Sequence, residues 1–203
     1  MTNSINEIEN SHVILVSGSN TTEAHPQIAR RMLDAVDRGA KLIVIDPRKT
    51  VLAECAHIHL ALRPGTDIPL LNAMMRIILD ENLADDLFIE MRTENFYQLR
   101  DMLYRLDLDE IAATTGVPLE KISKAAQIYA QAQKAVLCYC LGITQHICGT
   151  RNVQSLANLA MLTGNLEKED TGVDPLRGQN NVQGACDMGA RPNVFPRYQP
   201  ADT

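Results

Sequence analysis

Two short β-branched apolar runs constrain the fold of this chain more than any other feature. The first, His12–Val16, stops at a Ser-Gly-Ser-Asn turn and is followed by a helical pattern that continues to Arg38. The second, Lys41–Ile45, has no polar residue after its lysine, which is typical of a strand buried on both faces of a parallel sheet. The order of strand, helix and strand predicts a βαβ unit.

Strands and helices continue to alternate further along the chain. A third strand is predicted at about 58–62, before an apolar helix over 68–79, and a fourth at 135–141, before a helix over 153–162. The residues at about 84–132 show helical spacing and many charges, which predicts a helical insertion packed beside the sheet. We therefore predict a Rossmann-like, doubly wound α/β fold with a mainly parallel sheet, helices on both faces and a helical insertion.

The chain changes character after Leu166. From 167 to 203, glycine and proline recur, amides are frequent and little periodicity is visible. A stretch this long without regular structure is uncommon in a compact domain unless it binds something or belongs to a neighbouring domain. We predict an α/β domain over 1–166, followed over 167–203 by a binding loop and the start of a neighbouring domain.

Charge and composition limit the kinds of partner that this chain is expected to have. The 203 residues carry a formal net charge of −6 and contain no cluster of lysine and arginine. Nucleic acids and membrane surfaces attract basic patches, so this balance argues against both and favours a small ligand. No apolar stretch is long enough for membrane insertion and the acidic N-terminus is unlike a secretory signal, so we expect a cytoplasmic protein.

The cysteines predict neither a disulfide framework nor a zinc site. They are odd in number and irregularly spaced, and they form no C-x-x-C pair. We expect reduced, mostly buried thiols and no metal ligand within this chain. The five are Cys55, Cys138, Cys140, Cys148 and Cys186.

Polar and glycine residues follow each predicted strand. In an open parallel sheet, ligands bind outside the carboxyl ends of the strands, where the loops converge. These residues supply close backbone approach, hydroxyls, amides, carboxylates and a guanidinium. The candidate ligand-binding residues are Gly18, Ser19, Asn20, Asp46, Pro47, Arg48, Gly65, Thr66, Asp67, Gly142, Thr144 and Gln145.

Two of these turns allow more than one interpretation. A helix beginning after Gly18 would offer free N–H groups to a phosphate, yet the G-x-G-x-x-G fingerprint of ordinary NAD binding is absent. Asp46, at the end of the second strand, stands where a carboxylate commonly accepts hydrogen bonds from ribose hydroxyls. Asp46-Pro47-Arg48 is equally compatible with a surface turn and an exposed arginine.

Arg177 opens a run in which one guanidinium and four amides fall close together, Arg-Gly-Gln-Asn-Asn-Val-Gln-Gly. A planar guanidinium can bind a small carboxylate through two hydrogen bonds, and amides suit the edges of a heterocycle. A polar surface loop is the alternative. Among the histidines, His57 and His59 alternate on a strand pattern and are interpreted as packing residues, and His25, before a proline, as a helix-entry residue.

Taken in order, several short motifs and one longer run resemble the molybdopterin oxidoreductases, and the catalytic subunits of formate dehydrogenases in particular. The resemblance spans essentially the whole chain. The motifs are Gly18-Ser19-Asn20, Ile45-Asp46-Pro47-Arg48, Arg63-Pro64-Gly65-Thr66-Asp67, Leu141-Gly142-Ile143-Thr144-Gln145, Leu162-Thr163-Gly164-Asn165 and the thirteen-residue run from Arg177 to Gly189.

The resemblance implies a bis(molybdopterin guanine dinucleotide) cofactor with molybdenum or tungsten, and a subunit that oxidises formate to carbon dioxide. Residues 1–166 would then be the guanine dinucleotide-binding domain, with the glycine, Asp46 and Asp67 turns lining the guanosine and phosphate pocket. Arg177 would face formate as the catalytic arginine and Gln179 would lie close to the pterin. An arginine beside a bound carboxylate compensates its charge and orients it.

The resemblance also implies missing parts. Such subunits usually carry an N-terminal iron–sulfur segment, a cysteine or selenocysteine metal ligand and a further cofactor-covering domain, none of which is recognisable here. We therefore expect an interior fragment that does not oxidise formate alone, whose partners are the remaining domains or subunits and whose uncovered surface favours self-association. A stand-alone nucleotide-binding or assembly module and an ordinary nicotinamide dehydrogenase are the alternatives.

Overall fold

The computed structural model describes residues 1–179 and 181–201 and contains a five-stranded sheet in the order β3-β2-β1-β4-β5. Every pair in it is parallel. This confirms the predicted Rossmann-like, doubly wound arrangement. The strands are β1 (Val13–Ser17), β2 (Lys41–Ile45), β3 (Ile58–Leu60), β4 (Ala135–Tyr139) and β5 (Gly172–Pro175).

Alternate side chains of the central strands enter two different cores. On β1, Val13 and Leu15 pack into the core on one face, while Ile14 and Val16 pack into the core on the other. β2 and β4 divide their side chains in the same way. The strands are therefore apolar at nearly every position because both faces of the sheet are covered.

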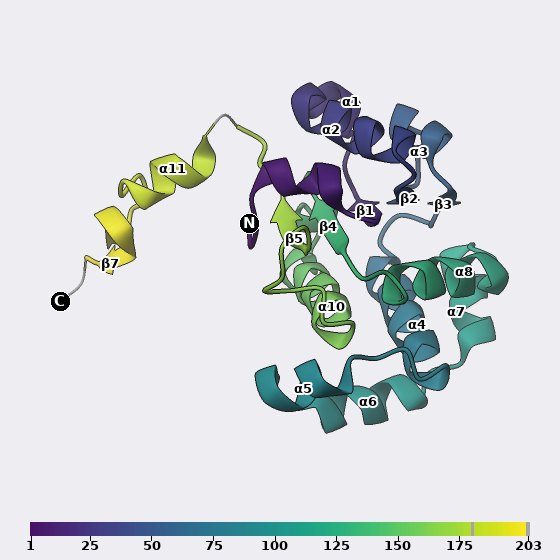
Figure 1. Cartoon of the computed structure of the whole chain (residues 1–203). Helices are drawn as coiled ribbons and strands as arrows, with labels where there is room; N and C mark the ends of the chain where they lie inside the picture. Colours follow the sequence, from purple (N-terminus) through teal and green to yellow (C-terminus); the bar gives the residue numbers. More distant parts are fainter. Residues whose placement is uncertain (180, 202–203) are drawn as a thin grey trace.

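The core that contains Ile14 and Val16 lies under the N-terminal helices, at the top of Figure 1. They are the 3-10 helix η1 (Ile5–Asn10), α1 (Thr21–Ala24), α2 (Pro26–Asp37) and α3 (Val51–Cys55). The sequence predicted one helical pattern through Arg38, but His25, with φ −141° and ψ 62°, separates α1 from α2. A residue before proline avoids the helical conformation, whereas Pro26 itself suits the first position of α2.

The core that contains Val13 and Leu15 is the larger of the two. It lies on the opposite face of the sheet (Figure 1). It is covered by α4 (Asp67–Asp80), α8 (Leu119–Ala130) and α10 (Gly149–Leu162), which pack on one another and on the sheet. The predicted insertion is helical, as expected. It comprises α5 (Asp86–Arg92), α6 (Phe96–Tyr104), α7 (Leu108–Thr115) and α8, of which α8 contributes Ile122 and Tyr129 to the core.

The chain leaves β4 two residues earlier than the sequence predicted. β4 ends at Tyr139, and Leu141–Thr144 form a short helix, α9. The following helix, α10, begins at Gly149 and so includes a turn that the apolar pattern from Val153 did not reveal. Polar residues occupy that first turn, so periodicity alone could not place its start.

A fifth strand was not predicted. β5 pairs with β4, with Asp174 opposite Cys138, and its outer edge is joined by the N-terminus, where the Thr2 amide donates to the Val173 carbonyl at 3.2 Å. A four-residue strand that begins with glycine and ends with proline gives no readable alternation. The predicted division of the chain into two domains at residue 166 stays a prediction. β5 follows that position in the sequence and belongs to the same sheet as the four strands before it.

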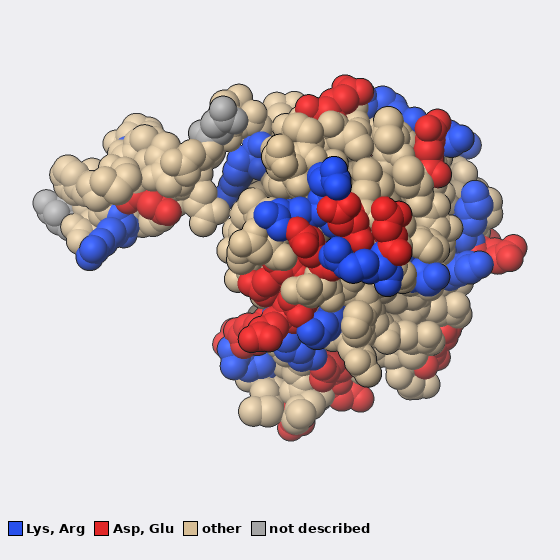
Figure 2. Space-filling model, turned by 45° about the horizontal axis from the view of Figure 1, so that its top comes forward, with Lys and Arg blue, Asp and Glu red and all other residues tan. Residues whose placement is uncertain are grey.

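The last described residues extend away from the sheet (Figure 1). They form α11 (Val182–Asp187), the small hairpin of β6 (Val194–Phe195) and β7 (Gln199–Pro200), and the 3-10 turn η2 (Pro196–Tyr198). Acidic and basic side chains are interspersed over the face shown in Figure 2. Across the described part of the chain, no helix combines the length and the apolarity that a membrane crossing requires.

Candidate functional site

Two glycines bring the ends of β1 and β4 into direct backbone contact. The Gly142 N–H donates to the Gly18 carbonyl at 3.0 Å, and the Gly18 N–H donates to the Ile45 carbonyl at 2.9 Å. Gly18 has φ +58°, and a Cβ at either glycine would lie less than 3 Å from backbone atoms of the other. From this point the chain continues from β1 into α1 and α2 on one face of the sheet, and from β4 into α9 and α10 on the other. The crevice between the ends of β1 and β4 is therefore the topological switch point.

A cavity of about 350 Å³ opens at this switch point. Nine of the sequence-predicted residues line it, from the ends of three strands and the start of α4: Gly18, Ser19, Asn20, Asp46, Pro47, Arg48, Gly65, Asp67 and Gly142. Seven others, which the sequence did not single out for binding, complete the wall, and six of them are Ala24, Leu62, Pro64, Cys140, Leu141 and His146. The seventh is Ile45, the last residue of β2.

Asp46 both starts a turn and lines the cavity. One carboxylate oxygen, Oδ1, accepts the Arg48 backbone N–H at 2.8 Å and lies 3.6 Å from the Arg48 Nε, so the residue does start a turn. Asp46 as a whole residue is only 3% exposed, and it lines the cavity. His59 Nε2 lies 2.8 Å from the Asp46 carbonyl, which supports the turn from β3 and agrees with a packing role for that histidine.

A second carboxylate faces the same cavity. Asp67 is the first residue of α4 and is 7% exposed. Burial raises the pKa of Asp67, and the nearby Asp46 carboxylate raises it further, whereas His146 lowers it. His146 is held by a contact of 2.8 Å between Nε2 and the Gly142 carbonyl. The cavity thus presents two buried carboxylates, a histidine and the Arg48 guanidinium.

Three predicted residues lie beside the cavity instead of in its wall. Thr66 donates its hydroxyl to the Arg63 carbonyl at 2.7 Å and so stabilises the turn before α4. Thr144 and Gln145 are exposed at the end of α9. Thr144 is the last residue of that helix and Gln145 is its C-cap, and neither lines the cavity.

Arg177 and Gln179 line a neighbouring cavity of about 210 Å³. It shares Ala24 with the first cavity and is also lined by His25. The Leu176 N–H donates to the Tyr139 carbonyl at 2.7 Å, which places the following Arg177 at the carboxyl end of β4. The structure thus brings the predicted arginine next to the switch point, although not into the same cavity. Asn180 lies outside the described residues.

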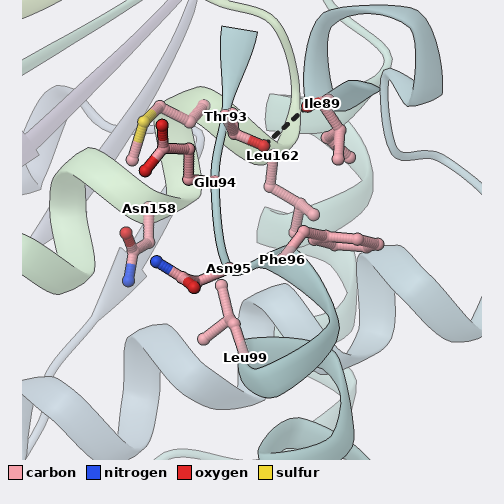
Figure 3. A pocket seen from close by; sticks show the side chains of 9 residues that line it. Ile89, Thr93, Glu94, Asn95, Phe96, Leu99, Asn158 and Leu162 are labelled. Atoms are coloured by element: carbon pink, nitrogen blue, oxygen red, sulfur yellow. Dashed lines mark hydrogen bonds between the residues drawn. The ribbon is translucent and has the colours of Figure 1, made fainter. Parts of the chain in front are cut away.

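The sequence did not reveal a third cavity, of about 240 Å³, between α5, α6 and α10 (Figure 3). Phe96, Leu99 and Leu162 form apolar walls, and Asn95 and Asn158 contribute amides. It lies away from the strand ends and is less charged than the switch-point cavity. Within the described residues, no group of three or more histidine, cysteine, aspartate or glutamate side chains is arranged to hold a metal ion.

Comparison with known proteins agrees with this architecture. Residues 1–200 match the family Molybdopterin oxidoreductase. The chain is 53% identical over 199 residues to the F420-dependent formate dehydrogenase subunit alpha of Methanocaldococcus jannaschii, and 47% identical over 199 residues to formate dehydrogenase H of Escherichia coli. These alignments cover 98% of the chain but only 30% and 28% of the two relatives.

More distant relatives carry other names. The chain is 37% identical to the assimilatory nitrate reductase catalytic subunit of Bacillus subtilis, over 98% of the chain and 28% of that protein. A solved structure of acetylene hydratase from Pelobacter acetylenicus superposes with a TM-score of 0.73 at 27% identity, over 80% of this chain and 24% of that one. One fold therefore serves proteins named for different substrates, so a reaction must be argued from site residues. On its sequence match and its fold, the chain belongs to the molybdopterin oxidoreductase family.

Proposed function

We propose that this chain binds the guanosine diphosphate portion of a molybdopterin guanine dinucleotide within a formate dehydrogenase-like oxidoreductase. The observation that carries the proposal is the pair of buried carboxylates, Asp46 and Asp67, in the cavity at the switch point. Dinucleotides bind at such switch points in doubly wound folds. The chain spans about 30% of the length of the relatives that it matches, so the complete reaction is assigned to the larger protein.

The residues present suit a guanine nucleotide. Guanine offers two adjacent N–H donors on its pairing edge, and a carboxylate can accept both, which is the role proposed for Asp67. Asp46 would accept from the ribose hydroxyls through Oδ2, because Oδ1 is engaged by Arg48. Gly18 and Gly142 place no β-carbon where they touch, which would leave room for a diphosphate to approach the backbone of Ser19 and Asn20.

The proposed reaction is the oxidation of formate to carbon dioxide, and the molybdenum or tungsten centre would supply its redox chemistry. Arg177 would bind the formate carboxylate and Gln179 would contact the pterin. Their location beside the nucleotide cavity supports this division of roles, because a single elongated cofactor could extend from one cavity to the next. The bis form of the cofactor contains two guanine nucleotides. Other parts of the protein would therefore also contribute to binding them.

The partners follow from the same proposal. The remaining domains or subunits would supply the iron–sulfur centre and cover surface that this chain leaves open, including Leu87, Met91 and Tyr97 on α5 and α6. Alone, we expect the chain to self-associate through such surface and not to oxidise formate. The thiols are all free, which suits the reducing cytoplasm.

Calorimetric titration with GDP, and with NAD for comparison, is expected to show preferential binding of GDP. Asp46→Ala removes the proposed ribose acceptor and should weaken GDP binding by about tenfold, the effect of losing roughly 1.4 kcal/mol from a charge-assisted hydrogen bond. Asp37→Ala, which removes an exposed carboxylate on α2, is the matched control and should leave binding unchanged. Equal affinity for NAD and GDP would contradict a guanosine site.

Asp67→Asn is expected to remove the preference for guanine more than the affinity for nucleotide. The amide nitrogen cannot accept the second guanine N–H, so GDP binding should weaken by about tenfold or more while ADP binding changes little. Because the pKa of Asp67 is raised, GDP binding by the natural protein should begin to weaken at a higher pH than an ordinary aspartate would cause. An unchanged ratio of GDP to ADP affinity would assign Asp67 to another role.

A further inference from the structure

The ring of His25 contacts the backbone of the arginine-bearing segment. Its Nε2 lies 2.5 Å from the carbonyl oxygen of Arg177, 152 residues further along the chain. A carbonyl oxygen can only accept, so Nε2 carries the hydrogen. The other ring nitrogen, Nδ1, is buried and has no hydrogen-bond partner among the residues described. This agrees with a bare lone pair there, because orphaned buried N–H groups are rarer than orphaned acceptors.

The peptide unit of Arg177 is held on both sides of this contact. Before it, the Leu176 N–H donates to the Tyr139 carbonyl at 2.7 Å. After it, Gly178 lies against the side chain of Leu141. Burial raises the pKa of Tyr139 while the Arg177 charge lowers it, in agreement with a guanidinium near the end of β4.

His25 also stands between the two cavities at the switch point. Asn20 and Ala24, at the two ends of the α1 turn, line the nucleotide cavity. Ala24 and His25 line the cavity that contains Arg177. The turn that carries the histidine is therefore shared by the proposed nucleotide site and the arginine segment.

We propose that His25 is a positioning residue, which fastens the Arg177 backbone so that its guanidinium stays at the carboxyl end of β4. The inference rests on the proposed role of Arg177 toward formate, and the histidine acts through the arginine. The helix-entry role expected from the sequence accounts for the backbone of His25 before Pro26. The helix-entry role does not account for the contact of the His25 ring with the Arg177 carbonyl.

Tryptic cleavage of the Arg177–Gly178 bond tests the contact directly, because the protease must engage the same carbonyl that His25 occupies. His25→Gln keeps a side-chain N–H near the position of Nε2, whereas His25→Leu fills a similar volume without a donor. The leucine variant should be cut at Arg177 about twofold to tenfold faster than the natural protein, the factor expected for one hydrogen bond when opening is fast relative to cleavage. The glutamine variant should be cut at nearly the natural rate.

Cleavage after Arg197, in the extended C-terminal segment, is the internal standard, and His12→Leu, at the opposite end of β1, is the control for an exposed histidine. Equal rates in the leucine variant and the natural protein would overturn the proposal. A glutamine variant cut as fast as the leucine variant would also overturn it, because packing alone would then explain the contact. If the leucine variant does not fold, His25→Ala provides the same comparison. No nucleotide is added, so failure of the guanosine site would not affect this result.

Discussion

Replacing Gly142 by alanine is expected to lower the free energy of unfolding by about 1–3 kcal/mol and to abolish GDP binding. A Cβ there would lie 2.6 Å from the Gly18 carbonyl oxygen and 2.7 Å from the Gly18 Cα. Both are backbone atoms, held by hydrogen bonds to β2 and to Gly142 itself. The ends of β1 and β4 must therefore separate, which breaks these bonds and deforms the cavity. Denaturant unfolding followed by circular dichroism measures the first effect, and titration with GDP the second.

Gly178→Ala is the matched control for this clash. Its added Cβ would meet only the end of the Leu141 side chain, at 3.3 Å, which can shift by a rotamer change. We expect its free energy of unfolding to stay within about 0.5 kcal/mol of the natural value. A Gly142→Ala protein with an unchanged denaturation midpoint would show that the two strand ends can part freely, and the switch-point geometry would lose its proposed importance.

Asp174→Asn is expected to raise the free energy of unfolding at pH 7.5, by about 1–3 kcal/mol. Asp174 is fully buried on β5, opposite Cys138, and neither carboxylate oxygen has a hydrogen-bond partner in the described part of the chain. Burial is the main cause that raises the pKa of Asp174 to about 6, against a smaller lowering effect from the nearby backbone N–H groups of Asn3 and Thr2. The asparagine mimics the protonated side chain and removes the cost of a buried, unpaired negative charge.

The sign of the pH dependence follows from the raised pKa. Between about pH 6 and the ordinary value of 3.8, the folded protein holds a proton on Asp174 that the unfolded chain releases. This group therefore makes the natural protein more stable as pH falls through that window, and the stabilisation is absent above it. The advantage of Asp174→Asn should shrink toward zero by about pH 4.

Denaturant unfolding at a series of pH values measures this effect, with Asp37→Asn as the exposed control. The control should change the free energy of unfolding little at any pH. A stability difference between Asp174→Asn and the natural protein that does not vary from pH 4 to 7.5 would contradict a raised pKa. It would mean that the nearby backbone N–H groups of Asn3 and Thr2 compensate the carboxylate fully.

Much of the fold could be predicted because its strands are buried on both faces. A continuous apolar run such as Lys41–Ile45 does not show the spacing of an amphipathic helix, so it predicts a buried strand. The turns after such runs place the strand ends within a residue or two. The prediction failed where elements are short or begin with polar residues. β5 contains only Gly172–Pro175, and α9 occupies four residues that the sequence assigned partly to β4.

The candidate site could be predicted in outline for a topological reason. Parallel strands place all their carboxyl ends at one edge, so residues such as Asp46, Asp67 and Gly142 meet although they are far apart in the chain. Residues whose role depends on a neighbouring loop were harder to assign. His146, just after the short helix α9, lines the cavity, whereas Thr144 and Gln145 at the end of that helix do not.

By itself, the sequence determined the α/β class, the strands that form the centre of the sheet and the family, because these depend on local patterns and on motif order. Only the tertiary structure decided which side chains share a cavity, that Gly18 and Gly142 touch, and that His25 holds the Arg177 carbonyl. These contacts join segments 124 and 152 residues apart. No local pattern records them, since they arise from the way parallel strands and their crossing helices close the sheet around one edge.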